Sequence, residues 1–318
     1  MSQNANAITI RHDSALPVFD QACTAELLGY RSLIDALADA AREYDAGAIR
    51  SPERMAVPIG PEGMLLSMPA TASDIGIHKL VSIQPGNARR GLPTIHGIVT
   101  VCDAATGRPL FLLDGPEVTG RRTAAITLLA IRELAATQPR EVVLFGTGAQ
   151  ARHHVQAFSE VYPEIQIWVR GRNQRSAAAF SENLRHIHRR IAPCPDAIPD
   201  SVGAVIMLTS STEPLYDEPA RHGRLVIGVG AFQPDMAEIG EVTLNGSVVC
   251  CDDVVGARVE AGDLLRAGVD WTKVHSLGSL LRNGRNSDGP FVFKSVGTGV
   301  WDLAASRVAA KSVCATPP

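Results

Sequence analysis

The sequence has 318 residues, of which 45% are hydrophobic, with a formal net charge of −3 and a pI near 6.3. At about 150 residues per domain, a chain of this length and composition can fill two cores, so we expect two domains. The near-neutral charge argues against nucleic acid as a partner, because nucleic-acid-binding proteins usually carry a basic excess on one face.

Cysteine usage and the N-terminal segment bear on the cellular compartment. The cysteines are scattered and form no C-x-x-C pair, which is typical of reduced thiols: Cys23, Cys102, Cys194, Cys250, Cys251 and Cys314. Met1 to Ala15 is polar and lacks the basic-then-apolar order of a signal peptide. No stretch reaches the ~18 apolar residues that a membrane span requires. We therefore expect a cytoplasmic protein with no membrane partner.

The first half of the chain combines helical periodicity with strand-like segments. Apolar residues recur at helical spacing from Thr24 to Ala46, which predicts amphipathic helices. Short apolar or β-branched runs, separated by Gly, Pro and Asn, then predict strands over Met64–Met68, His78–Ile83, Thr94–Cys102 and Pro109–Leu113. Thr106-Gly107, between the last two runs, is typical of a hairpin turn.

From Arg122 onward, strands alternate with helices. Helices are predicted over Arg122–Ala136, Ala149–Val161 and Gln174–Arg190. The strands are nearly continuous apolar runs: Glu141–Phe145, Gln166–Val169, Ala204–Leu208, Leu225–Val229 and Val248–Cys251. Such strands between helices indicate a parallel sheet covered on both faces. The Ala- and Val-rich end, Val300–Val313, predicts a terminal helix that packs back on the first domain.

A glycine motif follows the strand Glu141–Phe145 and leads into a helix. Its sequence, Gly146-Thr147-Gly148-Ala149-Gln150-Ala151, is the GxGxxA form of the dinucleotide fingerprint. Gly146 would permit the tight turn, Gly148 the approach of the pyrophosphate, and Ala151 close packing of helix on strand. The phosphates would bind at the N-terminus of the helix. A purely structural glycine turn is the alternative, but the surrounding strand and helix favour a cofactor.

The end of the next strand bears on which nicotinamide cofactor is used. NAD enzymes commonly have an acid there for the ribose 2′-hydroxyl. This chain has Arg170-Gly171-Arg172-Asn173 instead, with Arg175 close behind. Guanidinium groups suit a 2′-phosphate, so the sequence favours NADPH, with weaker use of NADH. The alternative is that these arginines form only a solvated loop.

Three basic residues of the first half are candidates for substrate binding. Lys79 lies between apolar neighbours in a predicted strand, Arg122 opens the long helix, and Arg54 lies in Ser51-Pro52-Glu53-Arg54-Met55. Singly, each is more often a surface charge. Together they would form a clamp for a carboxylate.

The histidines give no sign of a metal site. His153-His154 and His186-x-His188 lie on predicted helices at spacings that do not converge on one face. Cys or carboxylate partners are not apparent, so we expect no metal. His96, in a predicted strand, is interpreted as a packed or hydrogen-bonded histidine.

The whole chain resembles the ornithine cyclodeaminase/μ-crystallin family, most closely its cyclic ketimine (Δ1-pyrroline-2-carboxylate) reductases. The matching pieces occur in the family's order: Arg54, the Lys79 strand, Arg122-Thr123-Ala124-Ala125, Gly146 to Ala151, Gly228-Val229-Gly230-Ala231 and Phe293-Lys294-Ser295-Val296-Gly297. The resemblance implies a homodimer with a Rossmann-type doubly wound parallel sheet and a second α/β domain for substrate binding and dimerisation. We expect the second domain over 1–120, with a C-terminal helix at 300–318 packing back on it, and the dinucleotide-binding domain over 121–299.

The resemblance also assigns roles to individual positions. Arg54, Lys79 and Arg122 would hold the substrate carboxylate, with Lys79 and Arg122 as the catalytic residues. The cofactor would be bound by Gly146, Thr147, Gly148, Ala149, Gln150, Ala151, Arg170, Arg172, Asn173, Thr209, Ser210, Val229 and Lys294.

One position departs from the cyclodeaminases of this family. Their aspartate, thought to engage the substrate's amino groups, follows a pair of small residues and stands two places before a proline. Phe232 occupies that position here, between Gly230-Ala231 and Pro234. A phenyl ring can neither accept a proton nor pair with an ammonium. Asp235 is the nearest acid, but its different place in the turn should point it elsewhere, so the sequence favours a simple reductase.

We therefore predict NADPH-dependent reduction of a cyclic imino acid in proline metabolism. The substrate would be Δ1-pyrroline-2-carboxylate or Δ1-piperideine-2-carboxylate, and the product L-proline or L-pipecolate. Arg54 and Arg122 would anchor the carboxylate, whereas Lys79 would hydrogen-bond it or help deliver the proton. Two alternatives stay open: an ornithine cyclodeaminase with bound NAD, and a non-catalytic NADPH- or ligand-binding protein like μ-crystallin.

Overall fold

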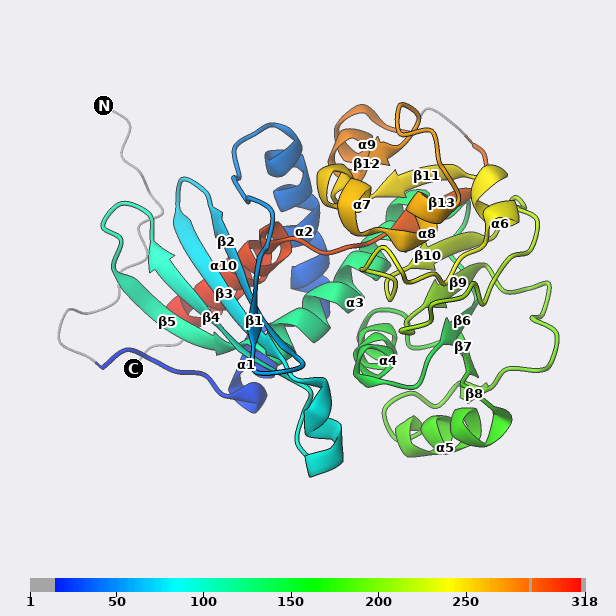
Figure 1. Ribbon diagram of the computed structural model, residues 1–318, viewed down its shortest axis with the longest axis horizontal. Helices are drawn as coiled ribbons and strands as arrows, with labels where there is room; N and C mark the ends of the chain where they lie inside the picture. The colour runs from blue at the N-terminus through cyan, green and yellow to red at the C-terminus, as the bar shows by residue number, and fades with distance from the viewer. Residues whose placement is uncertain (1–14, 286–287, 316–318) are drawn as a thin grey trace. The chain divides into compact units, whose positions relative to one another are not determined.

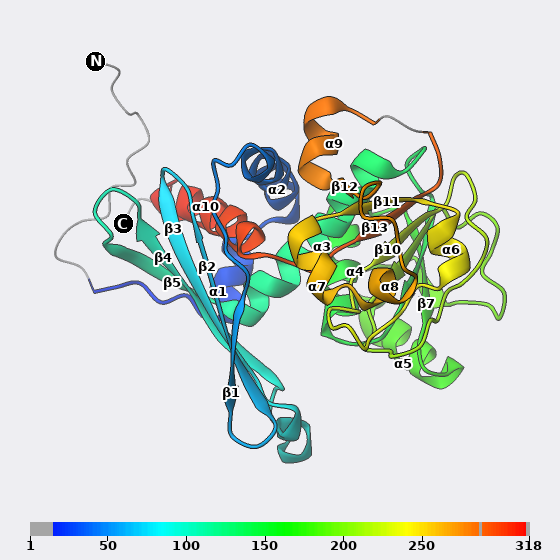
Figure 2. The same ribbon diagram turned by 45° about the horizontal axis from the view of Figure 1, so that its top comes forward.

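The computed structural model describes residues 15–285 and 288–315, so the polar segment Met1–Ala15 lies, apart from its last residue, outside the described residues. The chain divides into two units, drawn in Figures 1 and 2. Unit 1 contains the described residues up to Arg122 and those from Thr298 onward, and unit 2 contains Thr123–Gly297. Helix α3 (Gly115–Leu134) therefore contributes its first turns to unit 1 and the rest to unit 2.

Unit 1 is built on an antiparallel sheet of five strands in the order β1-β2-β3-β4-β5. The strands are β1 (Met55–Ile59), β2 (Gly63–Thr71), β3 (Ile75–Ile83), β4 (Ile95–Asp103) and β5 (Pro109–Asp114), with a 3-10 turn, η1 (Pro85–Arg90), between β3 and β4. Its other helices are α1 (Gln21–Leu27), α2 (Tyr30–Asp45) and α10 (Gly299–Ala315). Helix α10 contacts α1, α2, β2 and β3. It thus belongs to the core of unit 1.

The alternation of side chains along β3 determines the environment of Lys79. Successive residues of a strand point to opposite faces of the sheet. Ile75, Ile77, Lys79 and Val81 are all buried, whereas His78 is exposed. Lys79 therefore lies on the face that carries the hydrophobic core, next to α10.

The structure corrects two of the expected element boundaries and adds a strand to the first sheet. The long helix begins at Gly115, not at Arg122, because Asp114 Oδ1 accepts a hydrogen bond from Glu117 N at 2.7 Å and Pro116 is well tolerated in a first helical turn. The predicted helix over Gln174–Arg190 ends at Leu184. Strand β1 was not predicted, because its side chains are all exposed and Pro58 interrupts the pattern.

Unit 2 contains a parallel sheet of eight strands in the order β12-β11-β13-β10-β9-β6-β7-β8. The strands are β6 (Glu141–Phe145), β7 (Gln166–Arg170), β8 (Ile191–Pro193), β9 (Ala204–Met207), β10 (Leu225–Gly228), β11 (Val248–Cys251), β12 (His275–Ser276) and β13 (Phe291–Lys294). From β6 the strand order continues to β7 and β8 on one side and to β9, β10 and β13 on the other. The switch point therefore lies between β6 and β9, where open α/β sheets bind their ligands.

The helices of unit 2 connect these strands, and its central strands are buried. The helices are α4 (Ala149–Val161), α5 (Gln174–Leu184), α6 (Glu241–Asn245), α7 (Val254–Glu260), α8 (Gly262–Arg266) and α9 (Leu277–Asn283). Every residue of β9, β10 and β13 is buried. The expected fold class, a doubly wound parallel sheet with a second α/β domain, is confirmed. No helix among the described residues is long and apolar enough to cross a membrane.

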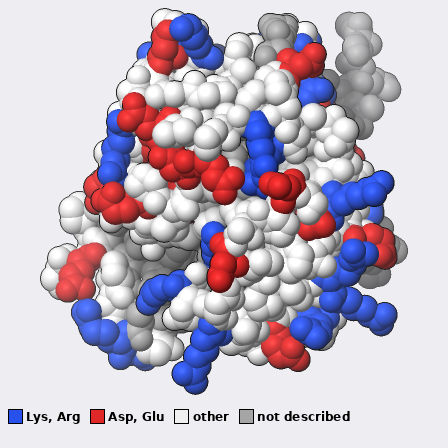
Figure 3. All heavy atoms as spheres, turned by 90° about the vertical axis from the view of Figure 1, so that its right-hand side faces the viewer, with Lys and Arg blue, Asp and Glu red and all other residues white. Residues whose placement is uncertain are grey.

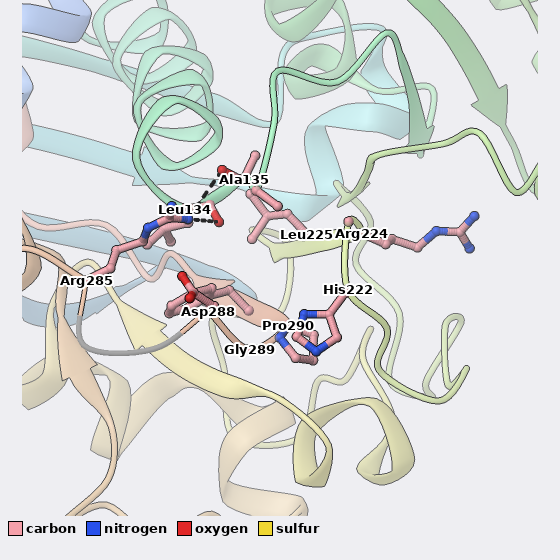
Figure 4. A pocket seen from close by; sticks show the side chains of 12 residues that line it. Leu134, Ala135, His222, Arg224, Leu225, Arg285, Asp288, Gly289 and Pro290 are labelled. Atoms are coloured by element: carbon pink, nitrogen blue, oxygen red, sulfur yellow. Dashed lines mark hydrogen bonds between the residues drawn. The ribbon is translucent and has the colours of Figure 1, made fainter.

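A small pocket of about 270 Å³ lies where β10 and β13 begin (Figure 4). Its two arginines are hydrogen-bonded to carbonyls of the protein itself. Arg285 Nη1 donates to the carbonyls of Leu134 and Ala135 at 3.3 and 3.4 Å. The Arg224 guanidinium points away from Arg285 and donates to Pro199 O at 2.7 Å. The molecular face in Figure 3 carries charges of both signs.

Candidate functional site

The second and larger pocket, of about 700 Å³, lies at the carboxyl ends of β6, β7 and β9. Its lining includes Gly146, Thr147 and Gly148 of the fingerprint, Arg170 and Arg172 after β7, and Thr209 and Ser210 after β9. This is the edge of the sheet at the switch point. Its size is in the range of cofactor sites in proteins.

The two glycines of the fingerprint serve different purposes. Gly146 has φ +121°, and a Cβ there would lie 2.6 Å from the carbonyl oxygen of Leu208, so packing and backbone geometry both demand glycine. A Cβ at Gly148 would meet no protein atom within 4 Å. Packing does not explain the second glycine, whereas a ligand phosphate approaching the backbone would.

The helix behind the motif also fits a dinucleotide. Gly148 is the N-cap of α4, and no side chain caps this helix end, so its first N–H groups are available to an anion. Ala151 is fully buried, as close packing on the sheet requires. Gln150 Oε1 is buried without a hydrogen-bond partner among residues 15–285 and 288–315, which leaves an acceptor for a ligand hydroxyl or a water.

The two arginines after β7 have different surroundings. Arg170 Nη2 donates to the carbonyls of Pro195 and Asp196 at 2.9 and 2.6 Å, and its guanidinium stacks over Phe145. Arg172 is exposed and makes no hydrogen bond or ion pair within the part of the chain that the structure describes. Asn173 caps α5 by accepting from Ser176 N at 2.8 Å. Arg172 is therefore the guanidinium whose donors are available for a 2′-phosphate.

A buried carboxylate, Glu238, joins the segments that follow β9 and β10. Its Oε1 accepts from Thr209 N and Oγ1 at 2.6 and 2.7 Å, and its Oε2 from Gly230 N and Ala231 N at 2.7 and 3.1 Å. Burial raises the pKa of Glu238, but four donors and the nearby Lys294 oppose that change. The position of Thr209 and the turn after Val229 thus depend on one side chain that the sequence analysis did not single out.

Lys294 is fully buried and forms an ion pair of 2.6 Å with Asp263. The other oxygen of Asp263 accepts hydrogen bonds from the backbone N–H groups of Glu238 and Ile239. The ammonium is therefore engaged inside the protein. Any contribution of Lys294 to cofactor binding would come through the loops that this network holds.

In unit 1 the structure brings Lys79 and Arg122 together around an acid that the sequence analysis missed. Lys79 Nζ lies 2.7 Å from Asp302 Oδ2, and Arg122 Nε lies 3.5 Å from Asp302 Oδ1. Lys79 is 2% exposed, Arg122 6% and Asp302 0%. Asp302 is in the first turn of α10, within an apolar run. A single acid in such a run was the one sequence signal that could have revealed it.

The charges of this cluster are not balanced. Two buried cations share one carboxylate, and Arg122 Nε has no hydrogen-bond acceptor among the described residues. The pKa of Lys79 is lowered to about 8, mainly by burial and to a smaller extent by Arg122 and Arg54, while the Asp302 carboxylate opposes this change. Arg54, half-buried just before β1, is thus close enough to act on Lys79 electrostatically. An anion such as a substrate carboxylate would complete the charge balance.

Phe232 and the histidines are the remaining residues to which the sequence drew attention. Phe232 is 37% exposed, and Asp235 is exposed on the same turn. His154 is fully buried, with Nε2 2.9 Å from Thr127 Oγ1, and burial lowers its pKa to about 4. His96 is exposed. No group of three or more metal-ligating side chains lies together in the described part of the chain.

Several known proteins are similar to this chain. The ornithine cyclodeaminase/mu-crystallin family profile matches residues 18–316. The Δ1-pyrroline-2-carboxylate/Δ1-piperideine-2-carboxylate reductase of Azospirillum brasilense is 50% identical over 303 residues, which cover 95% of this chain and 97% of that protein. A Burkholderia ambifaria protein named Δ1-pyrroline-2-carboxylate reductase 2 is 51% identical over 297 residues, covering 93% of this chain and 96% of its own length.

A solved structure extends the similarity to the fold. The Δ1-pyrroline-2-carboxylate reductase of Thermococcus litoralis, in complex with NADH and L-proline, superposes with a TM-score of 0.82 at 25% identity, covering 94% of this chain and 97% of that chain. The fold, the order of the motifs and the family match agree over nearly the whole chain. The protein belongs to the ornithine cyclodeaminase/mu-crystallin family.

Proposed function

We propose that the protein reduces the C=N bond of a cyclic imino acid with NADPH, converting Δ1-pyrroline-2-carboxylate or Δ1-piperideine-2-carboxylate to L-proline or L-pipecolate. The class, an imine-reducing oxidoreductase, follows from relatives at half identity that are named reductases. The NADH and L-proline in the Thermococcus litoralis complex support the same chemistry. The dinucleotide pocket of unit 2 supplies a place for the hydride donor.

The observation that carries this proposal is the excess of buried positive charge around Asp302. An isolated buried cation is costly, and here Lys79 and Arg122 have one carboxylate between them. A ligand with one carboxylate would occupy the remaining donors, such as Arg122 Nε. A cyclic imino acid carries that group next to the carbon that accepts the hydride. Binding the carboxylate therefore also orients the reacting carbon.

The chain's own residues would hold the substrate and supply a proton. Arg122 and Arg54 would bind the carboxylate, which leaves the Lys79 ammonium to donate to the imine nitrogen. Protonation makes the imine carbon electrophilic. NADPH, when bound, supplies the hydride. Its phosphates would lie against the N-terminus of α4, and its nicotinamide near Thr209, Ser210 and Val229.

The preference for NADPH rests on the loop after β7. The loop has no acid for a 2′-hydroxyl, and Arg172 is exposed beside the pocket. The Thermococcus litoralis complex contains NADH, so the preference proposed here rests on this chain's own residues. Because NADPH and free thiols are maintained inside cells, we place the activity in the cytoplasm, as part of proline metabolism.

One panel of assays tests the function. Purified protein is mixed with NADPH and Δ1-pyrroline-2-carboxylate, with NADH in place of NADPH, and with L-ornithine and NAD. We expect stoichiometric oxidation of NADPH and formation of proline, with a lower kcat/KM for NADH. Ammonia release from ornithine would instead identify a cyclodeaminase in which Asp235 or another acid replaces the aspartate missing at Phe232. Cofactor binding with no turnover would favour a non-catalytic protein.

We also propose that the protein is a homodimer that pairs through unit 1. Met55, Val57 and Ile59, alternate residues on one face of β1, are 63%, 46% and 41% exposed. An exposed apolar strand at a sheet edge usually has a partner.

Light scattering of the wild type should give about twice 33.8 kDa, and Val57→Lys should weaken the dimer. Val242→Lys, which changes a 52% exposed valine of unit 2, is the matched control. A wild-type mass of 33.8 kDa at micromolar concentration would rule the dimer out.

A further inference from the structure

Asp302 is a buried acid whose only ion-pair partners in the described chain are two groups assigned above to the substrate site. It lies in the first turn of α10, where the helix dipole favours a negative charge. One oxygen faces Lys79 at 2.7 Å and the other faces Arg122 at 3.5 Å. Neither oxygen accepts a hydrogen bond from any described residue, so the contacts with Lys79 and Arg122 are ion pairs. Its charge therefore acts on these two side chains.

The charged groups around Lys79 come from two helices and from the segment before β1. Asp302 on α10 attracts the ammonium, whereas Arg122 on α3 and Arg54 before β1 repel it. The remaining polar contact is the uncharged Thr119 Oγ1, at 3.5 Å from Nζ. Lys79 is 2% exposed, so water screens these interactions little. Without Asp302, burial and two like charges would all favour a neutral amine.

We propose that Asp302 is a positioning residue that keeps Lys79 protonated and directs its Nζ–H group for proton donation to the substrate imine. This inference rests on the proposed function and adds to it the group that maintains the proton donor. Asp302 itself touches neither substrate nor cofactor in this scheme. It acts through the ion pair with Lys79.

The proton balance of the step is simple. An Nζ–H bond of Lys79 breaks and an N–H bond forms on the imine nitrogen, which gives the iminium. NADPH, when bound, would supply the hydride that reduces the iminium carbon and would itself be oxidised to NADP⁺. Lys79, now a neutral amine, regains a proton from solvent before the next turnover. The Asp302 carboxylate gives up and takes no proton in this step, and its negative charge favours that recovery.

The test is the pH dependence of turnover in wild type, Asp302→Asn and Asp302→Glu. In the wild type the rate should fall above about pH 8, where Lys79 loses its proton. Asp302→Asn removes the attractive charge of the carboxylate. The alkaline limb, which is the part of the pH profile where the rate falls, should therefore move down by about 1–3 pH units. At pH 7.5 kcat should then fall about threefold for a shift of one unit and about two-hundredfold for a shift of three units. Asp302→Glu keeps the charge and should restore the limb to within about half a unit.

The effect on KM separates this role from a structural one. In Asp302→Asn at pH 7.5, one negative charge is lost and Lys79 also loses its positive charge. The net charge that the substrate carboxylate meets is therefore unchanged, so KM should change less than threefold while kcat falls. At a pH below the shifted limb, kcat should recover. An equal loss of kcat at every pH, with the limb in its wild-type place, would overturn the proposal.

A matched control tests another ion pair on the same helix. Arg307 of α10 pairs with Asp74 at 2.8 Å and with Glu43 at 2.9 Å. Asp74→Asn also removes a carboxylate that pairs with a cation, but one that lies outside the substrate cluster. It should leave both the limb and the ratio of kcat to KM at wild-type values. A limb shift of similar size in this variant would show that the effect is not specific to Asp302.

Two further measurements cover failure of folding or of the proposed function. If Asp302→Asn does not fold, Lys79→Met is compared with Lys79→Met/Asp302→Asn, in which the charges of Lys79 and Asp302 are removed together. The second substitution should then change kcat less than threefold, and a further tenfold loss would overturn the proposal. If the wild type does not reduce imines, binding of pyrrole-2-carboxylate is followed against pH by calorimetry. If binding weakens at a lower pH in Asp302→Asn than in the wild type, Asp302 keeps Lys79 protonated even though the proposed function is wrong. If binding weakens at the same pH in both, the proposal is overturned.

Discussion

Two buried lysine–aspartate pairs in this protein have nearly the same length and opposite surroundings. Lys294 and Asp263 of unit 2 are 2.6 Å apart, and Lys79 and Asp302 of unit 1 are 2.7 Å apart. Around the first pair, Glu238 adds a second carboxylate, and backbone N–H groups supply both acids with hydrogen bonds. Around the second, Arg122 adds another cation, and Arg122 Nε has no acceptor among the described residues.

The difference indicates which pair supports the fold and which supports the chemistry. A buried polar network whose members are all satisfied fixes the conformation of the segments that it joins. A network with a surplus of one charge is costly until a ligand of the opposite charge binds. The length of an ion pair does not distinguish these cases. The remaining hydrogen-bonding capacity of its members does.

The largest effect on stability should come from breaking the satisfied pair. Lys294→Met leaves Asp263 without its cation in a fully buried place, so the free energy of unfolding should fall by about 3–5 kcal/mol. Chemical denaturation followed by circular dichroism measures this change. In Lys79→Met, Asp302 keeps Arg122 as a partner, so the loss should be smaller by at least half. Equal losses would mean that the two clusters do not differ in the way proposed.

The largest effect on catalysis should come from the unsatisfied cluster. Lys79→Met or Arg122→Ala should lower kcat/KM for Δ1-pyrroline-2-carboxylate by roughly 10²-fold or more, about 3 kcal/mol, because a buried charge-assisted contact is removed. Steady-state kinetics at pH 7.5 gives the value, and Asp74→Asn is the control. A loss below fivefold in both variants would remove these residues from the substrate site.

The same contrast applies, with a smaller effect, to the two arginines beside the cofactor pocket. Arg172 has no partner in residues 15–285 and 288–315, so Arg172→Ala should raise KM for NADPH by about tenfold and change KM for NADH little. Arg170 supports the carbonyls of Pro195 and Asp196, so Arg170→Ala should affect both cofactors alike. Kinetics with each cofactor separates the two roles. The reverse pattern would make Arg170 the group that recognises the 2′-phosphate.

Phe232 provides the finest distinction, between reduction and cyclodeamination. Phe232→Asp places a carboxylate where the resemblance puts the aspartate of the cyclodeaminases, and it should impair imine reduction by repelling the substrate carboxylate. We expect no ammonia release from ornithine, because that chemistry also needs room for an open-chain diamine. Assays of NADPH oxidation and of ammonia measure both outcomes. Faster imine reduction by the variant would contradict the proposed repulsion.

Local sequence patterns were sufficient for much of the fold. The strand at Glu141–Phe145, the helix at Ala149–Val161 and the glycine motif between them occur as predicted, because a continuous apolar run, a helical period and a tight turn each depend on neighbouring residues. The start of α3 was missed, since Gly115 and Pro116 resemble helix breakers although Asp114 and position in the first turn make them acceptable.

The satisfaction of charges depends on residues that are distant in the sequence, and only the tertiary structure decided it. The sequence assigned Lys79 and Arg122 to the substrate and Lys294 to the cofactor, and it indicated an acidic partner for none of them. The fold places Asp302, more than two hundred positions after Lys79, against the first two, and Asp263 against the third. It likewise turns Arg170 toward backbone carbonyls and leaves Arg172 exposed. A side chain's identity determines its charge, whereas only its packed neighbours determine whether that charge is already balanced or is available to a ligand.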